Sequence, residues 1–262
     1  MGGRMNDRMG PPLRGPPGGP GMRGPPQDRY MGRGPPGAGD MNHGRSVDPR
    51  APAALPTPVL MVYNVPPAVN CDGIFNLFSL YGQVMKAKKL PNKEGAYMVE
   101  MLDGMAAGAV LDALQGTTWY GSEVALQPSK HLFMGGNTST NETRTVVDYT
   151  QSEHNRFSRG NKNTKVHEPT KVVHFYNLPP ELTLDQLGAI FSDNGAPMPI
   201  DQVIFNKGPE KKSSSGLVEF ADVDSATQAV ISAHHSQILM GERKFTVKMA
   251  FSATIAVNSK KQ

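Results

Sequence analysis

Two tyrosines occupy matching places in the sequence, and their surroundings indicate what they could do chemically. Tyr63 lies in the apolar run 59–65 and Tyr176 in the apolar run 172–178; each is followed by Asn, one aliphatic residue and two prolines. Short apolar runs that stop at prolines are typical of β-strands. An aromatic ring on the exposed face of a strand can stack on an unpaired nucleic-acid base.

A second pair of matching segments predicts how these strands are held. Residues 97–101 (Tyr-Met-Val-Glu-Met) match residues 216–220 (Gly-Leu-Val-Glu-Phe), in the same order relative to the tyrosines, so the chain contains an internal duplication. In each copy a capped amphipathic helix follows the first strand, and an Ala-rich helix precedes the last strand. We therefore predict an α+β fold of two ferredoxin-like βαββαβ units. The expected strands are 59–65, 83–90, 97–101 and 123–127, then 172–178, 202–206, 216–220 and 244–250.

The two helices of such a unit cover one sheet face, so alternate strand residues point to an open face. This open face is flat and half apolar, which suits the stacking of unpaired bases better than the binding of a small substrate. Its expected members on the two central strands are Met61, Tyr63, Ala96, Met98 and Glu100 in the first unit, and His174, Tyr176, Ser215, Leu217 and Glu219 in the second.

Lysines flank both faces. Lys86 and Lys88 alternate on the second strand of the first unit, and Lys244 and Lys248 alternate on the last strand of the second. We expect these side chains to contact phosphates, while the alternative is a solvated edge strand on which lysine prevents pairing. Gln127 and Lys130, at the end of the last strand of the first unit, can reach a base from the rim of the sheet.

The net charge of +4 does not bear on these faces. Residues 1–50 contain eight Arg, no Lys and four Asp, so the remaining chain is formally neutral. Three copies of Arg-Gly-Pro-Pro and many other Gly and Pro residues predict a disordered tail over residues 1–57. The expected organisation is this tail, a unit at 58–131, a linker at 132–170, a unit at 171–252 and a C-terminal tail at 253–262.

The two units resemble RNA-recognition motifs of the polypyrimidine-tract-binding protein family, and specifically the last two motifs, the C-terminal half, of its L-type heterogeneous nuclear ribonucleoproteins. The resemblance covers about residues 57–252. The residues that carry it are the strand-one hexamers 60–65 and 173–178, the strand-three octamers 94–101 and 213–220, and Asn155-Arg156-Phe157. It implies a nuclear RNA-binding protein that recognises single-stranded, CA-rich pre-mRNA or mRNA and regulates alternative splicing and mRNA processing or stability. Other splicing or ribonucleoprotein components are the implied protein partners, and shuttling to the cytoplasm is left open.

The chain departs from the general motif at the usual stacking positions. These positions are Met61, Ala96, Met98, His174, Ser215 and Leu217, and none of them is Phe, Tyr or Trp. The L-type and polypyrimidine-tract-binding proteins share this substitution, so the resemblance implies that the faces still bind RNA, with Tyr63 and Tyr176 as the aromatic platforms. The family ordinarily carries four motifs, and this chain has two.

The helix at 71–81 is apolar on nearly all sides, although a two-layer unit needs only one buried stripe. The family precedent is back-to-back packing of the final two motifs through their helical faces. We expect such packing here, with the participants Leu77, Leu80 and Tyr81 and, from the linker, Phe157.

The sequence also bears on other classes of function. The seven His show no metal-ligand spacing, and the single Cys71 excludes an internal disulfide, so we expect no metal and no cofactor. No apolar run reaches the length of a membrane span, so we expect no membrane contact. An acylphosphatase-like enzyme would need a placed Arg, and residues 51–143 contain none, so we expect no enzyme activity. The alternative that stays open is a protein-interaction module of a ribonucleoprotein complex with little RNA binding of its own.

Overall fold

The computed structural model describes residues 55–135, 146–157, 165–205, 208 and 210–257. The chain divides into residues Met1–Ala51 and Pro52–Gln262, and the described residues all belong to the second part. The predicted N-terminal tail therefore lies outside the described residues up to residue 54, as do parts of the predicted linker and C-terminal tail.

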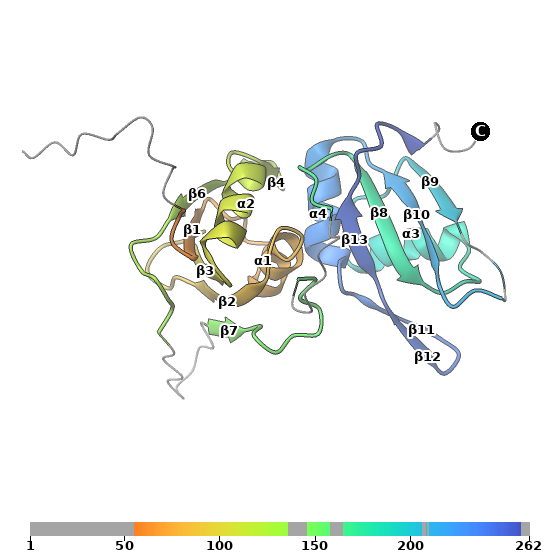
Figure 1. Ribbon diagram of the computed structural model, residues 1–262. Coiled ribbons are helices and arrows are strands. Elements are labelled where there is room, and N and C mark those ends of the chain that lie inside the picture. Colours follow the sequence, from red (N-terminus) through yellow and green to blue (C-terminus); the bar gives the residue numbers. More distant parts are fainter. Residues whose placement is uncertain (1–54, 136–145, 158–164, 206–207, 209, 258–262) are drawn as a thin grey trace, which may run out of the picture. The chain divides into compact units, whose positions relative to one another are not determined.

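The first motif is an antiparallel sheet with two helices on one face (Figure 1). The element order is β1 (Val59–Tyr63), α1 (Cys71–Phe78), β2 (Val84–Lys89), β3 (Tyr97–Met101), α2 (Gly104–Leu114) and β6 (Ala125–Pro128). A small hairpin of β4 (Thr118–Trp119) and β5 (Ser122–Glu123) precedes β6. The linker strand β7 (Val146–Asp148) adds to the sheet, whose order is β6-β1-β3-β2-β7.

The second motif repeats this arrangement, which confirms the predicted duplication and the α+β fold. Its elements are β8 (Val172–Leu178), α3 (Leu184–Asp193), β9 (Asp201–Phe205), β10 (Ser214–Glu219), α4 (Val223–Ala233) and β13 (Lys248–Phe251), with the sheet order β13-β8-β10-β9. The predicted last strand, 244–250, is divided in two. Its first half, β12 (Arg243–Thr246), pairs with β11 (Gln237–Met240) in a separate hairpin, and only β13 joins the sheet.

The Tyr-Asn pairs have the same backbone conformation near the ends of β1 and β8. Asn64 and Asn177 have φ of 60° and 65°, a left-handed conformation that Asn tolerates better than most residues. The Asn64 Nδ2 donates to the Glu123 carbonyl (3.3 Å), and the Asn177 Nδ2 donates to the Thr246 carbonyl (2.8 Å). Each asparagine thus ties the first strand to the segment before the last strand, with the preceding tyrosine near the end of its strand.

The cores of the two motifs differ in where a large and a small residue face each other. On the helix-covered face, Val62 pairs with Tyr97 in the first sheet, and Phe175 pairs with Gly216 in the second. All four residues are buried. The large and small partners are exchanged between β1 and β3 relative to β8 and β10, so a similar volume is filled.

The linker closes onto the first motif. The strand β7 pairs antiparallel with β2, and the Tyr149 hydroxyl donates to Asp72 Oδ1 (2.7 Å) while its ring stacks on Phe75 with centroids 4.2 Å apart. Asn155 is 4% exposed, and its amide accepts from the Val84 N–H (3.0 Å) and donates to the carbonyls of Val84 and Tyr149 (both 2.9 Å). The side chain of Asn155 therefore fastens the linker to β2.

The helix α1 contacts α4 of the second motif, which is the helix-to-helix packing expected from the sequence. The Asn76 Nδ2 donates to the Ile231 carbonyl (3.0 Å), and the Asn76 Oδ1 lies 2.9 Å from Nδ1 of His235. Leu77, Leu80 and Tyr81 are buried and Phe157 is half-buried, and their part in this contact stays a prediction.

Candidate nucleic-acid interface

The open face of the first sheet presents a continuous row of side chains across four strands. Strand register places each of them directly opposite the next, so they share one face. The row is Lys88, Met98, Met61 and Gln127, from β2, β3, β1 and β6. Gln127 is exposed and the other three are half-buried, so this half-apolar row lies on the surface where the sequence placed it.

Tyr63 lies beside this row at the end of β1. It is half-buried and pairs with Ala125 of β6. The Nζ of Lys93, from the exposed turn between β2 and β3, lies 4.2 Å from the centroid of the Tyr63 ring. A cation at this distance over the ring makes a favourable cation–π contact. Sequence reasoning missed Lys93, because only the fold of the turn brings it to the ring.

The second sheet presents a row that contains two aromatic rings and lies one step further along the first strand than the row of the first sheet. Its members are Phe205, Ser215, Tyr176 and Lys248, from β9, β10, β8 and β13. Phe205 was not predicted as a site residue. Strand alternation on the predicted strand 202–206 was the signal that could have found it, because Ile204 packs against the core while Val203 and Phe205 lie on the other face.

His174 lies in the next row and stacks on Tyr176, with ring centroids 5.6 Å apart and an interplanar angle of 19°. Burial lowers the pKa of His174, and the charge of Arg156 lowers it further. Burial also raises the pKa of the Tyr176 hydroxyl. Both rings are therefore uncharged at neutral pH and present a stacked pair. Arg156, a linker residue that was not predicted as a site residue, adds a cation whose field acts on both rings.

The structure corrects three of the predicted positions. Ala96 is 0% exposed; its N–H donates to the Lys93 carbonyl and its carbonyl accepts from the Leu90 N–H, which fixes it within the β2–β3 turn. Leu217 is 5% exposed, because Val257 packs over it. Lys244 lies on the β11–β12 hairpin opposite Leu239 rather than in the sheet beside Lys248.

The remaining predicted cations differ in their surroundings. Lys88 and Lys248 take part in the rows described above, and Lys130 is exposed beyond β6. Lys86 faces Glu100 across the strands at 3.9 Å, and its Nζ donates to the Met134 carbonyl (3.3 Å). The Lys86 ammonium is therefore held by the protein itself.

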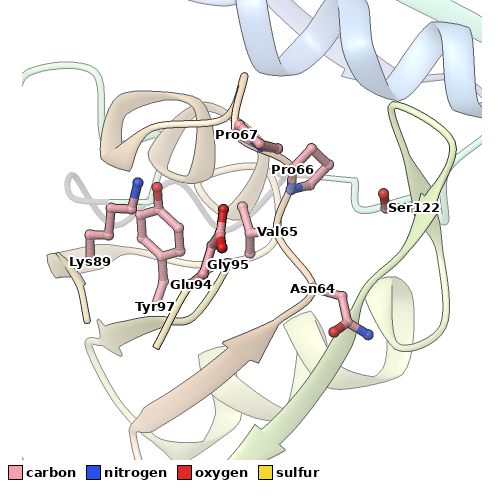
Figure 2. Close-up of a pocket in the computed structure, with 9 residues that line it drawn as sticks. All are labelled: Asn64, Val65, Pro66, Pro67, Lys89, Glu94, Gly95, Tyr97 and Ser122. Carbon is pink, nitrogen blue, oxygen red and sulfur yellow. The ribbon is translucent and has the colours of Figure 1, made fainter. Parts of the chain in front are cut away.

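A pocket of about 360 Å³ lies next to the end of β1, between the β1–α1 loop and the β2–β3 turn (Figure 2). Its polar lining includes Asn64, Lys89, Glu94 and Ser122, and Tyr97 forms one wall. The Tyr97 hydroxyl donates to the Val69 carbonyl (2.8 Å) and is thus committed to the fold. The pocket offers groups of both charges beside the position where the chain leaves Tyr63.

In the part of the chain that the structure describes, no group of three or more His, Cys, Asp and Glu side chains is placed to hold a metal ion. Every helix there is too short or too polar to cross a membrane.

Two family models and several known proteins match this chain. A family model described as "RRM domain" matches residues 162–258, and one described as "RNA recognition motif. (a.k.a. RRM, RBD, or RNP domain)" matches residues 39–152. Heterogeneous nuclear ribonucleoprotein L from Mus musculus and from Homo sapiens are each 33% identical over 253 residues, which is 94% of this chain and 41% of theirs. Polypyrimidine tract-binding protein homolog 3 of Arabidopsis thaliana is 30% identical over 173 residues, 65% of this chain and 38% of its own.

These matches confirm the predicted relationship. None of the three relatives has the name of an enzyme, in line with the sequence-based expectation. The chain spans about 40% of the length of the curated relatives it matches.

Proposed function

Because the chain belongs to the family of proteins with RNA-recognition motifs, we propose that it binds single-stranded RNA on the open faces of its two sheets. The preferred sequence is CA-rich, as the similarity to heterogeneous nuclear ribonucleoprotein L suggests. In the cell the chain acts in the nucleus, together with other splicing or ribonucleoprotein components, as a regulator of alternative splicing and of mRNA processing or stability. The proposal includes shuttling of the protein between the nucleus and the cytoplasm.

The observation that carries this proposal is the duplicated tyrosine at the end of the first strand, with a cation beside each ring. Lys93 lies over Tyr63, and Lys248 lies directly opposite Tyr176 on the neighbouring strand. A base that stacks on such a ring brings its phosphate close to the ammonium group, so each pair supplies both parts of sequence-tolerant single-strand binding. The site side chains in contact with RNA are then the two rows together with Tyr63, Lys93 and His174.

Affinity rests on these local contacts rather than on net charge. The formal charge beyond residue 50 is zero, and only a few lysines lie beside the proposed faces, so few phosphates are contacted and few counterions are displaced. Affinity for RNA therefore falls only modestly as salt rises.

The test is a titration of CA-repeat RNA, with a pyrimidine-only RNA of the same length for comparison. In Tyr63→Ala plus Tyr176→Ala each lost ring removes about 1–3 kcal/mol of stacking, which is roughly a 5- to 150-fold loss of affinity per site. The matched control, Tyr63→Phe plus Tyr176→Phe, keeps both rings and binds like the wild type. Equal affinity of the alanine variant and the wild type would show that the assigned faces are wrong. Absence of RNA binding by the wild type at low salt would favour the protein-interaction module instead.

A further inference from the structure

The segment that follows the last strand is folded in the same way in both motifs. The Thr57 hydroxyl lies 2.6 Å from the Ser129 carbonyl, to which it donates, and the Thr170 hydroxyl donates to the Ser252 carbonyl (2.9 Å). Each serine hydroxyl then accepts from the N–H two residues further on, of His131 (3.1 Å) and of Thr254 (3.2 Å). The sequences after the two serines differ, so the shared path is set by these few bonds.

Each segment then returns to the open face of its sheet and is held there by a glutamate. The Met134 N–H donates to Glu100 Oε2 and the Val257 N–H donates to Glu219 Oε2, both at 2.8 Å. Glu100 and Glu219 occupy the same position of the third strand, opposite Val59 and Val172 of the first. Residues 129–134 and 252–257, which we call the cover segments, thus end on the same carboxylate in the two motifs.

The second cover segment buries part of the surface that the sequence alone leaves open. Val257 is 0% exposed and packs with Val172 and Leu217, while Val203 and Phe205 lie at the margin of this cluster. Glu219 is held from both sides, because its Oε1 also pairs with Lys171 Nζ at 2.8 Å. These contacts lower the pKa of the Glu219 carboxyl, with Lys171 as the main cause, so it is ionised when it accepts the Val257 N–H.

The first cover segment has the same design with different side chains. Met134 is 5% exposed, Val59 is 0% exposed, and the Lys86 ammonium reaches both the Glu100 carboxylate and the Met134 carbonyl. Each sheet therefore has a covered end, at the glutamate, and an uncovered end, at the tyrosine.

We propose that Glu100 and Glu219 are positioning residues that hold the cover segments across one end of each face and so limit how much of each sheet an RNA can contact. The proposal rests on the RNA-binding function proposed above. Bases stack at the tyrosine end and are excluded from the strand positions beneath Met134 and Val257. The glutamates thereby set the number of nucleotides that each motif holds.

The first test measures the cover segments without RNA, in the full chain. Amide hydrogen exchange of Val257 becomes faster in Glu219→Ala, and that of Met134 becomes faster in Glu100→Ala. Glu242→Ala, at an exposed position of the β11–β12 hairpin, is the matched control and leaves both rates unchanged. Unchanged exchange in the first two variants would overturn the positioning role, whatever the RNA results.

The second test uses CA-repeat RNAs of increasing length, with Glu219→Ala, Val257→Ser and a chain that ends at Ser252. Wild-type affinity stops rising at a certain length. In the three variants it continues to rise over the next nucleotide, by about fivefold, which is the effect of one added base at the low end of the stacking range. Affinity for the shortest RNA stays the same. A purely structural role would weaken all lengths alike, and an unchanged plateau with faster exchange would overturn the limit on RNA contact. A wild type that binds no RNA of any length would overturn the proposed function itself.

Discussion

Replacement of Asn155 by Ala tests whether the linker is part of the first motif. The Asn155 amide is buried and bonded to three backbone groups, the N–H and C=O of Val84 and the C=O of Tyr149. Alanine leaves these groups without that partner in a site from which water is excluded. Each buried polar group left unpaired costs about 1–3 kcal/mol, and since the three share one side chain the costs overlap, so we expect a loss of about 3 kcal/mol in the free energy of unfolding.

The assay is urea denaturation followed by tryptophan fluorescence. The chain has one Trp, Trp119, which is fully buried in the first motif with its ring edge-on to Phe78, so its fluorescence reports this motif. The control Asn92→Ala, in the exposed β2–β3 turn, changes the free energy of unfolding by less than about 0.5 kcal/mol. If Asn155→Ala lowers the free energy of unfolding by less than about 1 kcal/mol, the Asn155 side chain does not fasten the linker to β2.

Three further predictions concern stability. In Gly216→Ala the new Cβ would overlap the Val203 carbonyl oxygen, so the free energy of unfolding falls by about 1–3 kcal/mol in denaturant melts; an unchanged midpoint would contradict this packing. Tyr149→Phe removes the hydroxyl that donates to Asp72 and lowers the free energy of unfolding by about 1.5–3 kcal/mol, a loss that a double-mutant cycle with Asp72→Ala assigns to the pair. Burial, followed by the charges of neighbouring cationic groups, lowers the pKa of His235 to about 3, so between about pH 6.5 and 3 the unfolded chain binds a proton that the folded chain excludes. Stability is therefore full above pH 6.5 and falls as the pH drops through this window, and denaturation at pH 7 and pH 5 should show a smaller fall in His235→Asn.

The fold could be predicted because its signals are local and occur twice. The proline-terminated strands, the cap at Asn70 and the capping box at Thr183 depend on residues near each other in the chain, and all are present in the structure. The tyrosine positions were inferred from strand alternation; in the structure Tyr63 pairs with Ala125 and Tyr176 with Ser215, and their contact with RNA stays a prediction.

The positions that could not be predicted depend on contacts between distant segments. Leu217 has the alternation of an open-face residue, but Val257, which lies beyond the last strand, covers it. The linker strand β7 has only three residues and forms because β2 offers it an unpaired edge. The division of the strand 244–250 also escapes a pattern search, because the alternation of buried and exposed residues continues through Val247.

The linker strand has a consequence for how each sheet meets other chains. An edge strand with unpaired backbone groups is a template on which a further strand can add. In the first motif β7 occupies the outer side of β2, so this edge is already used within the chain. Among the described residues, no strand pairs with the outer side of β9 in the second motif. Although the two motifs share one fold, the corresponding edge strand of the sheet is therefore β7 in the first motif and β9 in the second.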